Sequence, residues 1–484
     1  MISFLVHAAC FCGQVTTQLP VALSLFILTL RGLSSAKTAN RGNLLGMAGM
    51  LLVIAAPILM ASRNLLFTKP SQMYFFYLTM CTLVCGGFIG YRVAKKVSMT
   101  ALPQLLATFH SLVGLAAIFI AWAVQTSPYT FGLIGSPEEY FLSEINALEL
   151  AIGTVVGAIT FAGSLIAAGK LHGIIKGTLS YKGRKGVTLT LALILVLLIA
   201  FYTICPCTHV FCPILAISLM LGYLLIMPVG GADMPVIVSM LNSYSGWAAA
   251  GIGFTLNNIL LIVVGALVGM SGAILSSIMC KGMNRSIRSV IFGGAGATTA
   301  PTCSGTTQPK GNVKLCSGED AAIILKNAST VIVVPGYGMA VSQAQHALRE
   351  LAEALQNDDV TVKYAIHPVA GRMPGHMNVL LAEANIPYED VFEGGEINRE
   401  FSTTDVVLVV GANDITNPAA KTDPTSPIYG MPVLDVGNAK TVLFIKRSLA
   451  AGYAGIDNDL FYKENTMMLL GDAKKVLETV LRSF

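Results

Sequence analysis

The stretch Val331-Ile332-Val333-Val334-Pro335-Gly336-Tyr337-Gly338-Met339-Ala340-Val341 decides the fold of the C-terminal part of the chain. Its β-branched run predicts a buried parallel strand, its two glycines predict a tight turn, and residues 339–356 carry helical spacing. This order is typical of a dinucleotide-binding loop, in which Gly336 permits the turn, Gly338 lets a pyrophosphate approach the backbone, and the helix N-terminus faces the phosphates. Val341 replaces the third glycine of that motif, so a strand, turn and helix without a ligand is the alternative interpretation.

The rest of the C-terminal sequence continues this alternation of strands and helices. Strands are predicted at residues 361–366, 405–410, 441–445 and 466–469, and helices at 378–384 and from 472 onward. Strands that alternate with helices predict a doubly wound, Rossmann-like α/β domain, here over residues 321–484.

The composition divides the 484 residues into two unlike parts. The chain is 54% hydrophobic and 12% charged, with a mean hydropathy of +0.68, which excludes an ordinary soluble protein of this size. Residues 1–290 hold 5 of the 26 acidic and 16 of the 31 basic residues, a net charge of 16 − 5 = +11. Residues 291–484 hold the other 21 and 15, a net charge of 15 − 21 = −6, and neither part indicates a nucleic-acid partner.

The N-terminal part is predicted to be a polytopic α-helical membrane domain in contact with lipid, over residues 1–281. A membrane span needs about 20 mostly apolar residues, and nine segments qualify: residues 12–32, 44–61, 74–92, 104–124, 148–168, 187–204, 213–228, 234–250 and 254–280. Met1 to Pro20 has no basic residue before its apolar stretch, so this segment is assigned to the first span and not to a cleaved signal peptide.

The distribution of basic residues predicts the orientation of these spans. Fourteen Lys or Arg lie at the ends of odd-numbered spans and in the connectors that follow them, against two for even-numbered spans. By the positive-inside rule the N-terminus is outside, and everything after Lys281 lies in the cytosol or an equivalent compartment such as the matrix. The chain is therefore expected in a bacterial inner membrane or an equivalent energy-transducing membrane.

Two further motifs are interpreted as structural. Residues 282–320 are rich in Gly, Thr and Ser, so they are predicted to be a flexible linker, and the glycines of residues 293–296 within it are not assigned to a phosphate loop. Cys205, Cys207, His209 and Cys212 have zinc-like spacing, but they belong to a short connector between two spans. Such a connector is too cramped for a closed tetrahedral site, so no metal is predicted.

The candidate binding residues follow the predicted strands, because ligands of open parallel sheets bind at the carboxyl ends of the strands. The loop after the second strand carries glycines and Arg372, and the loop after the third begins Gly411-Ala412-Asn413-Asp414. Lys446, Arg447 and Ser448 follow the fourth. The second strand ends without the acid that binds a ribose 2′-hydroxyl in NAD sites, so the basic cluster favours NADP(H). Solvated loop charges are the alternative for Lys446 and Arg447.

Several longer strings carry a resemblance to a known family. GYGMAV, HPVAGRMPGHMNVLLAEA, GANDITNPAA, PIYGMPVLDV, KRSLAAGYAG and GDAKK, with DMPVIVSMLNSYSGW in the membrane part, resemble the β subunit of proton-translocating NAD(P) transhydrogenase over nearly the whole chain. The resemblance implies a hetero-oligomer in which a partner α subunit binds NAD(H), and a homodimeric assembly of the αβ unit is expected. It also implies an inverted orientation of the bound NADP(H).

The resemblance also implies which residues contact NADP(H), with Gly336–Val341 as the pyrophosphate turn, Tyr337 closing over the nucleotide, and Lys446, Arg447 and Ser448 on the 2′-phosphate. The implied set is Gly336, Tyr337, Gly338, Met339, Ala340, Val341, Val369, Ala370, Gly371, Arg372, Met373, Pro374, Gly411, Ala412, Asn413, Asp414, Ile415, Gly430, Met431, Lys446, Arg447, Ser448, Leu449, Ala450, Ala451, Gly452, Tyr453, Asp472 and Ala473.

The membrane part contains a deeply placed histidine, His110. It lies about 10 Å beyond Pro103, and Asn242 lies about 12 Å beyond Met234, so the two residues are at similar depth and contact between them is possible. An intramembrane ionisable group that titrates near neutral pH predicts a proton site, with a packed core histidine as the alternative. The resemblance assigns proton translocation to the same two positions. Asp233 is predicted at the inner surface, as a sensor of the soluble domain or an ordinary helix cap.

Two functions from different classes fit this sequence. The first is an enzyme subunit that couples hydride transfer between NAD(H) and NADP(H) to proton translocation, with the NAD(H) site on a partner chain. The second is a transporter or channel that NADP(H) binding regulates. Direct hydride transfer requires no protein acid, base or nucleophile, so the sequence need not contain a catalytic triad.

Overall fold

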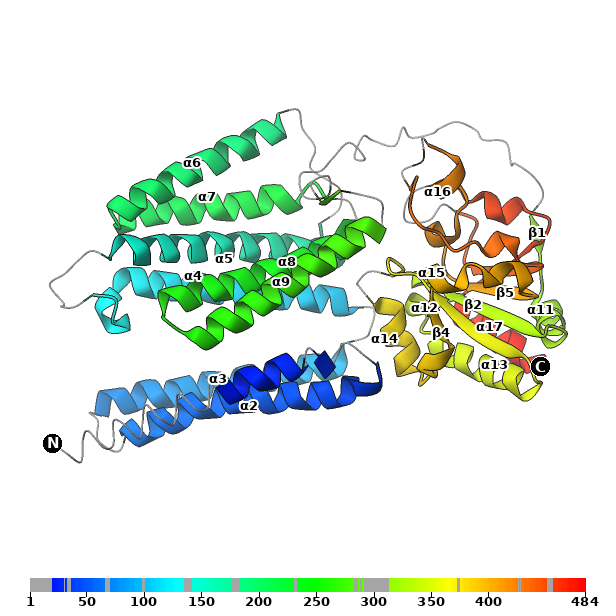
Figure 1. Cartoon of the computed structure of the whole chain (residues 1–484), viewed down its shortest axis with the longest axis horizontal. Coiled ribbons are helices and arrows are strands. Elements are labelled where there is room, and N and C mark those ends of the chain that lie inside the picture. The colour runs from blue at the N-terminus through cyan, green and yellow to red at the C-terminus, as the bar shows by residue number, and fades with distance from the viewer. Residues whose placement is uncertain are drawn as a thin grey trace. The chain divides into compact units, whose positions relative to one another are not determined.

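The structure is a computed structural model whose elements form a helical part and a sheet part (Figure 1). It describes residues 20–29, 31–32, 36–65, 70–97, 101–134, 142–175, 183–229, 233–282, 286–287, 290, 313–371, 375–424, 426, 428–450 and 456–484. The glycines of residues 293–296 lie outside these ranges.

The helical part follows the predicted membrane spans. Residues 20–29 are helical within the first span, and each later span overlaps one helix: α2 (Ala36–Leu65), α3 (Pro70–Lys96), α4 (Leu102–Thr126), α5 (Glu144–Leu171), α6 (Arg184–Ile204), α7 (Thr208–Ile226), α8 (Met234–Thr255) and α9 (Ile259–Gly282). Six of the described helices, namely α3 to α7 and α9, are long and apolar enough to cross a membrane. The polytopic helical membrane domain is confirmed, while the number of nine spans stays a prediction.

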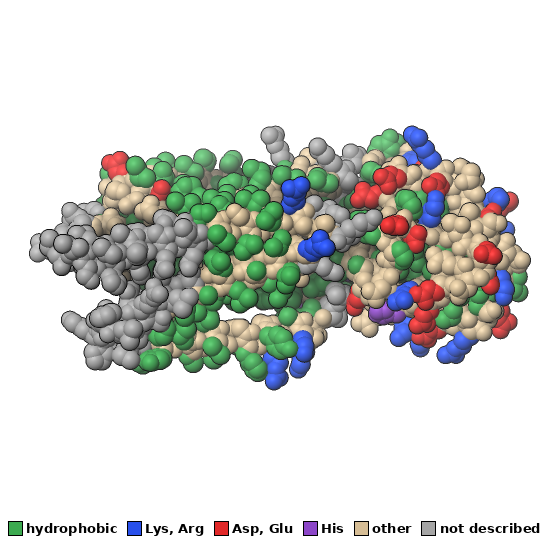
Figure 2. All heavy atoms as spheres, turned by 60° about the horizontal axis from the view of Figure 1, so that its bottom comes forward, with side chains coloured by type: hydrophobic (Ala, Val, Ile, Leu, Met, Phe, Trp, Pro, Cys, Tyr) green, Lys and Arg blue, Asp and Glu red, His purple; other side chains and the backbone are tan. Residues whose placement is uncertain are grey.

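Small residues let the helices of this part approach closely. A side chain on Gly114 of α4 would come within 2.7 Å of the Gly157 carbonyl oxygen on α5, and one on Gly222 of α7 would lie equally close to the Ile159 oxygen. Close backbone approach at small residues is how membrane helices gain packing energy without a hydrophobic driving force. Large apolar side chains lie along the face of this part that Figure 2 shows, and Leu197 of α6 is 69% exposed.

The sheet part contains seven parallel strands in the order β1-β7-β6-β5-β2-β3-β4 (Figure 1). The strands are β1 (Lys314–Leu315), β2 (Thr330–Pro335), β3 (Thr361–Ile366), β4 (Val391–Glu393), β5 (Val406–Val410), β6 (Thr441–Lys446) and β7 (Thr466–Leu470). Every residue of β5 is buried, which requires cover on both faces of the sheet. The predicted α/β fold is confirmed, and its strand order reverses between β2 and β5.

The structure corrects the helix predicted over residues 339–356. Two helices occupy this stretch, α12 (Tyr337–Ser342) and α13 (Gln345–Asn357), and Gln343 between them has a φ of 52°. The Ser342 hydroxyl donates to the carbonyl oxygen of Gly338 at 2.9 Å. A serine that bonds back to the preceding turn competes with the helical backbone and favours a bend, which accounts for the break.

The sheet part also contains short elements that the sequence pattern did not predict. β1 pairs with β7, β4 pairs with β3, and α11 spans Gly318–Lys326, so ordered structure begins before the expected domain start at residue 321. Ser317 and Asp320 form a capping box at the start of α11, the pattern that satisfies free N–H groups at a helix N-terminus. The other helices of eight or more residues are α14 (His376–Glu383) and α17 (Ala473–Arg482).

Candidate nucleotide site and membrane histidine

The loops that follow β2 and β5 cross each other at the carboxyl edge of the sheet. The Gly336 N–H donates to the Val410 carbonyl oxygen at 2.9 Å, and the Gly338 N–H donates to the Gly411 oxygen at 2.8 Å. These strands lie on either side of the point where the strand order reverses, and this point is where open α/β sheets bind ligands. The sequence therefore identified two loops that the fold brings into direct contact.

Three glycines are required by this crossing for steric reasons. A Cβ on Gly336 would lie 2.4 Å from the Ala412 Cα, and one on Gly338 would lie 2.6 Å from the Gly411 Cα. Gly411 has a φ of +65°, and its own Cβ would lie 2.4 Å from the Gly338 Cα. Gly336 has an extended backbone, with a φ of −133°, so close approach to Ala412, and not turn conformation, is the reason for a glycine there.

The turn after β2 leads into α12, whose exposed and buried sides explain the missing third glycine. Met339 and Ala340 are buried, whereas Val341 is 41% exposed, so its side chain needs no close packing between helix and strand. The Tyr337 ring lies 6.2 Å from the ring of His376, edge to face. His376 in turn fills the space beside Gly371, whose φ is +99° and whose Cβ would lie 2.6 Å from the His376 Nδ1.

His367 joins the loop after β3 to the segment that contains Gly430 and Met431. Its Nε2 lies 2.7 Å from the Pro432 carbonyl oxygen, and the Val369 N–H donates to its Nδ1. Because one ring nitrogen accepts, the other donates to Pro432, and burial lowers the pKa of His367. The neutral ring therefore connects these two segments, and Val369 packs against the small hydrophobic cluster that contains Met431.

Lys446 and Arg447 lie at the end of β6 with partners of their own. The Lys446 ammonium donates to the Ala450 carbonyl oxygen and lies 4.8 Å from the centre of the Phe461 ring. Burial lowers the pKa of Lys446, and the carboxylates of Asp414 and Asp457 oppose that shift. The Arg447 guanidinium donates to Asp472 at 2.9 Å.

The Arg447 to Asp472 ion pair links the end of β6 to the start of α17. The side chains of Arg447 and Asp472 are 61% and 32% exposed, so the pair is accessible to an anion and contributes little to stability. Asp472 is the N-cap residue of α17, with Ala473 as its first residue, but its carboxylate makes no capping bond. Ser448, Leu449 and Ala450 continue from Arg447 as an exposed loop.

The loop after β5 is held by asparagines that the sequence analysis did not single out. The Asn458 amide donates to the Asn413 backbone oxygen and side-chain oxygen, and the Asn417 amide donates to the Asp457 carbonyl oxygen. Asn413 Nδ2 is buried, and no acceptor for it lies among the described residues. Only the three-dimensional fold reveals Asn458, because no motif spacing connects it with Asn413.

The structure describes some of the remaining residues predicted to contact NADP(H). Gly430 has a φ of +77° and donates its N–H to Ala420 at 2.7 Å, while Ala370, Ala412, Ile415 and Met431 are buried. The residues that lie outside the described ranges are Arg372, Met373, Pro374, Ala451, Gly452 and Tyr453.

In the membrane part, the structure gives His110 of α4 a polar partner on α8. The Ser245 hydroxyl lies 3.0 Å from the His110 Nδ1 and also lies within hydrogen-bonding distance of the Leu241 carbonyl oxygen. Asn242 lies on the same helix, three residues before Ser245. Sequence reasoning missed Ser245, although the helical spacing from Asn242 to Ser245 could have identified it. Asp233 directly precedes α8.

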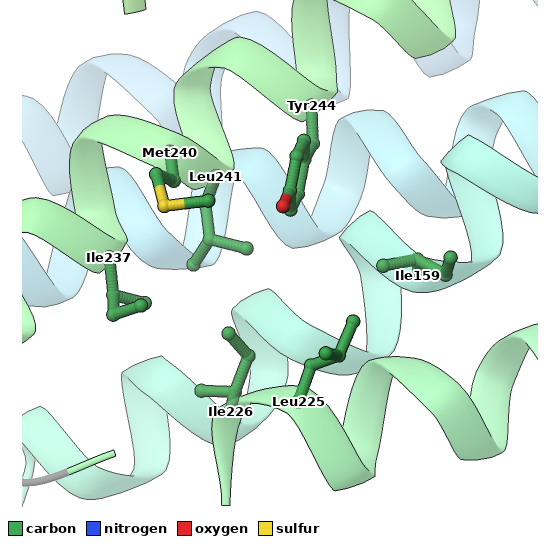
Figure 3. A pocket seen from close by; sticks show the side chains of 7 residues that line it. All are labelled: Ile159, Leu225, Ile226, Ile237, Met240, Leu241 and Tyr244. Atoms are coloured by element: carbon green, nitrogen blue, oxygen red, sulfur yellow. The ribbon is translucent and has the colours of Figure 1, made fainter. Parts of the chain in front are cut away.

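An apolar cavity in the membrane part is lined by residues of α5, α7 and α8 (Figure 3). Its lining residues are Ile159, Leu225, Ile226, Ile237, Met240, Leu241 and Tyr244. Tyr244 supplies the single side-chain hydroxyl of this lining. A buried water needs two to four polar partners, so this cavity is not by itself a water path.

Comparison with known proteins identifies the family. The family described as NAD(P) transhydrogenase beta subunit matches residues 15–483 of the chain. The chain belongs to that family. It is 55% identical over 464 residues to the NAD(P) transhydrogenase subunit beta of Rhodospirillum rubrum, covering 96% of this chain and 97% of the relative. A second sequence of that name, from Rhodospirillum rubrum strain ATCC 11170, has the same identity and coverage.

Membership in the NAD(P) transhydrogenase beta subunit family confirms the resemblance drawn from the motifs. The chain is a subunit of a transhydrogenase enzyme that uses nicotinamide nucleotides, and the name of the family implies a partner alpha subunit. With six long apolar helices among its described residues, it is a membrane protein.

Proposed function

We propose that this subunit binds NADP(H) at the crossing of the loops after β2 and β5, and couples hydride transfer to proton movement through its membrane part. The crossing supports this assignment most strongly, because Gly336, Gly338 and Gly411 leave backbone without side chains at the strand reversal. The proposal also takes in the contacts expected for the loops that contain Gly371, Gly430, Lys446 and Asp472.

The described residues fit a dinucleotide phosphate. Asn413 carries a buried amide nitrogen without an acceptor among the described residues, and the exposed Arg447 has planar donors suited to a phosphate. Lys446 adds a second positive charge at the same strand end. We assign Lys446, Arg447 and Ser448 to the 2′-phosphate, which makes NADP(H), and not NAD(H), the ligand of this chain.

The hydride chemistry belongs to the nucleotides themselves. Bound NADP(H) supplies a nicotinamide that accepts or donates hydride, and the protein contributes binding, orientation and exclusion of water. The second nucleotide, NAD(H), is assigned to the partner alpha subunit. The complete enzyme is proposed to be a dimer of such αβ units, with the sheet domain on the cytosolic or matrix side, as the distribution of basic residues favours.

The proton site is assigned to His110, with Ser245 as its hydrogen-bond partner and Asn242 one helical turn away. An ionisable side chain at this depth in a membrane helix is rarely tolerated without a functional reason. Asp233 is assigned to the inner surface, where the connector before α8 responds to the state of the nucleotide domain. Nucleotide states that differ in their interaction with this connector would link the two reactions.

The deciding experiment replaces the proposed proton site. In vesicles that contain both subunits, His110→Ala is expected to lower proton translocation at least about tenfold, because it removes the ionisable side chain proposed to carry the proton. NADP(H) should still bind to the same preparation. The measurement is the quenching of a pH-sensitive dye together with nucleotide binding by calorimetry.

His209→Ala is the matched control, because His209 is an exposed histidine at the start of α7. It should translocate protons at the original rate. A His110→Ala enzyme that acidifies or alkalinises vesicles as fast as the unchanged enzyme would disprove the assignment. Proton conduction that responds to NADP(H) without any hydride transfer would instead establish the regulated-channel function.

A further inference from the structure

Lys170, near the end of α5, binds three backbone carbonyl oxygens at the end of α7. Its ammonium donates to the oxygens of Ile226 at 3.3 Å, of Met227 and of Val229 at 2.9 Å. A lysine has three N–H donors, so its capacity is used fully by this one connector. The described residues contain no carboxylate within ion-pair distance of Lys170.

Two of these oxygens, those of Ile226 and Met227, belong to the end of α7, and Val229 follows in the connector. The last four carbonyl oxygens of a helix have no intrahelical N–H, and a cation at this end also interacts favourably with the helix dipole. The Lys170 ammonium supplies these oxygens with hydrogen-bond donors from within the protein. Lys170 therefore anchors the start of the α7–α8 connector to α5.

A second hydrogen bond continues this connection from α5 to α4. The Gln104 amide donates to the Leu171 carbonyl oxygen at 3.3 Å, one residue beyond Lys170. His110 lies six residues further along α4, about 9 Å at the helical rise. The His110 to Ser245 hydrogen bond then joins α4 to α8.

Side-chain hydrogen bonds of Lys170, Gln104 and His110 thus connect the α7–α8 connector, α5, α4 and α8 in a ring. The connector before α8 is fixed to α5 by Lys170, α5 is fixed to α4 by Gln104, and α4 returns to α8 through His110. A displacement of the connector that carries Asp233 therefore strains the environment of His110 by two routes, along α8 and through α5 and α4. Packed helices joined by hydrogen bonds can carry coupling in this way when they have discrete arrangements.

We propose that Lys170 is a positioning residue for energy coupling: it transmits movement of the α7–α8 connector to the helix that carries His110. This inference rests on the proposed function, because it requires His110 to be the proton site. Lys170 touches neither nucleotide nor the transferred proton. Its loss is expected to separate the two reactions of the enzyme, and not to stop hydride transfer.

The test compares the number of protons translocated per hydride transferred. In proteoliposomes that contain both subunits, Lys170→Met keeps the length of the side chain but removes its three donors. We expect the ratio of protons to hydrides to fall at least about fivefold, the lower end of typical coupling between sites. Stimulation of hydride transfer by an uncoupler should fall in parallel, while NADP(H) affinity is retained.

Lys96→Met is the matched control, because Lys96 is an exposed lysine in the last turn of α3. This variant removes the same charge but no hydrogen-bond donor to the end of α7. Its ratio of protons to hydrides should therefore equal that of the unchanged enzyme. Lys170→Arg, which keeps a charged donor, should retain more than half of the original ratio.

Two results would overturn the inference. One is a normal ratio in Lys170→Met. The other is a parallel loss of hydride transfer and proton translocation with the ratio unchanged, which is the result expected of a purely structural cap. If neither the unchanged enzyme nor the Lys96→Met control translocates protons, the result contradicts the proposed function itself. The two results above contradict only the role of Lys170.

Discussion

At the scale of single residues, Lys446 and Arg447 both have partners within the protein. Lys446 bonds the Ala450 carbonyl oxygen, and Arg447 bonds Asp472. A phosphate bound at the proposed site would therefore exchange these existing charge-assisted contacts for charge-assisted contacts to the phosphate. The exposed pair between Arg447 and Asp472 contributes little to stability, so this exchange costs little.

The first residue-scale prediction concerns nucleotide choice. Replacement of Lys446 and Arg447 by alanine removes two charge-assisted contacts, each about 1.5–3 kcal/mol. NADP(H) affinity should fall at least about tenfold, since 1.4 kcal/mol changes a binding constant by that factor. Calorimetry on the full chain should show NAD(H) binding unchanged or improved. The double variant Lys475→Ala, Arg482→Ala on α17 removes the same charge elsewhere and should bind NADP(H) normally.

A second residue-scale prediction concerns acid stability through Asp405. This carboxylate accepts hydrogen bonds from Lys440 at 2.8 Å and from the N–H of Ser329 at 2.9 Å, which together lower its pKa to about 2. Because the folded-state pKa lies below the ordinary value of 3.8, the stabilisation is complete above about pH 4 and is lost as the pH falls towards 2.

Asp405→Asn should therefore lower the melting temperature at pH 7, and the difference from the unchanged protein should shrink between pH 4 and pH 2. Loss of hydrogen bonds to a charged group corresponds to about 1.5–3 kcal/mol. Thermal unfolding of the sheet part of the full chain measures the effect. Glu353→Gln, which breaks an exposed pair with Arg349, should change the melting temperature little. An equal difference at every pH would contradict the assignment to Asp405.

At the scale of elements, the site depends on how closely two loops can approach. Gly411 meets Gly338 backbone to backbone, and its φ of +65° is a conformation that other residues rarely adopt. Gly411→Ala adds about 1–2 kcal/mol of backbone strain and about 1–3 kcal/mol of overpacking.

Gly411→Ala should accordingly destabilise the sheet part and weaken NADP(H) binding at least about tenfold. Gly395→Ala is the control, since nothing lies within 4 Å of the added methyl group and its φ is not positive. Chemical unfolding and calorimetry of the two variants provide the comparison. Equal behaviour of Gly411→Ala and Gly395→Ala would show that the crossing tolerates a methyl group.

The sequence predicted the strands that are long enough to show a clear hydrophobic pattern. β2, β3, β5, β6 and β7 contain five or six residues each, mostly β-branched or apolar, and their predicted bounds agree with the structure within one residue. β1 and β4 have two and three residues, too few for any periodicity. The break at Gln343 depends on the bond from the Ser342 hydroxyl, which a hydrophobic pattern does not report.

The site was predictable to the extent that topology places loops together. The carboxyl ends of parallel strands share one edge, so the loops beginning at Gly336 and Gly411 could be assigned to one region from the sequence. Their atomic crossing could not, because it depends on the register between β2 and β5. The same holds for the membrane part, where depth along each helix located His110 and Asn242 but not the rotation of α8 that presents Ser245.

At the scale of the whole molecule, the helical part and the sheet part differ in the side chains that they expose. The helical part exposes apolar side chains and carries few charges, whereas charged side chains gather on the sheet part (Figure 2). A subunit built in this way can hold a proton site in lipid and a water-soluble nucleotide in one chain. Energy can pass between them only if the nucleotide states differ in their interaction with the membrane part.

The last prediction is that the proton-motive force sets the direction of the reaction. The two nicotinamides have nearly the same chemistry, so the uncoupled equilibrium constant should lie near one. A force of roughly 180 mV supplies about 4 kcal/mol per proton, at about 2.3 kcal/mol per 100 mV. That energy corresponds to about three decades of product ratio, so energised membranes should drive NADPH formation from NADH, and an uncoupler should abolish this drive.

The sign of the gradient distinguishes coupling from regulation. Vesicles that contain both subunits should acidify in one direction of the reaction, and alkalinise when the reaction is run backwards, because a coupled proton reverses with the hydride. His110→Ala vesicles should approach the same product ratio with and without an imposed gradient. A channel that nucleotide merely opens would dissipate any existing gradient and would leave the final NADPH ratio independent of an uncoupler. The change in the final NADPH ratio on adding an uncoupler therefore measures how much free energy of the proton gradient is transferred to the hydride reaction.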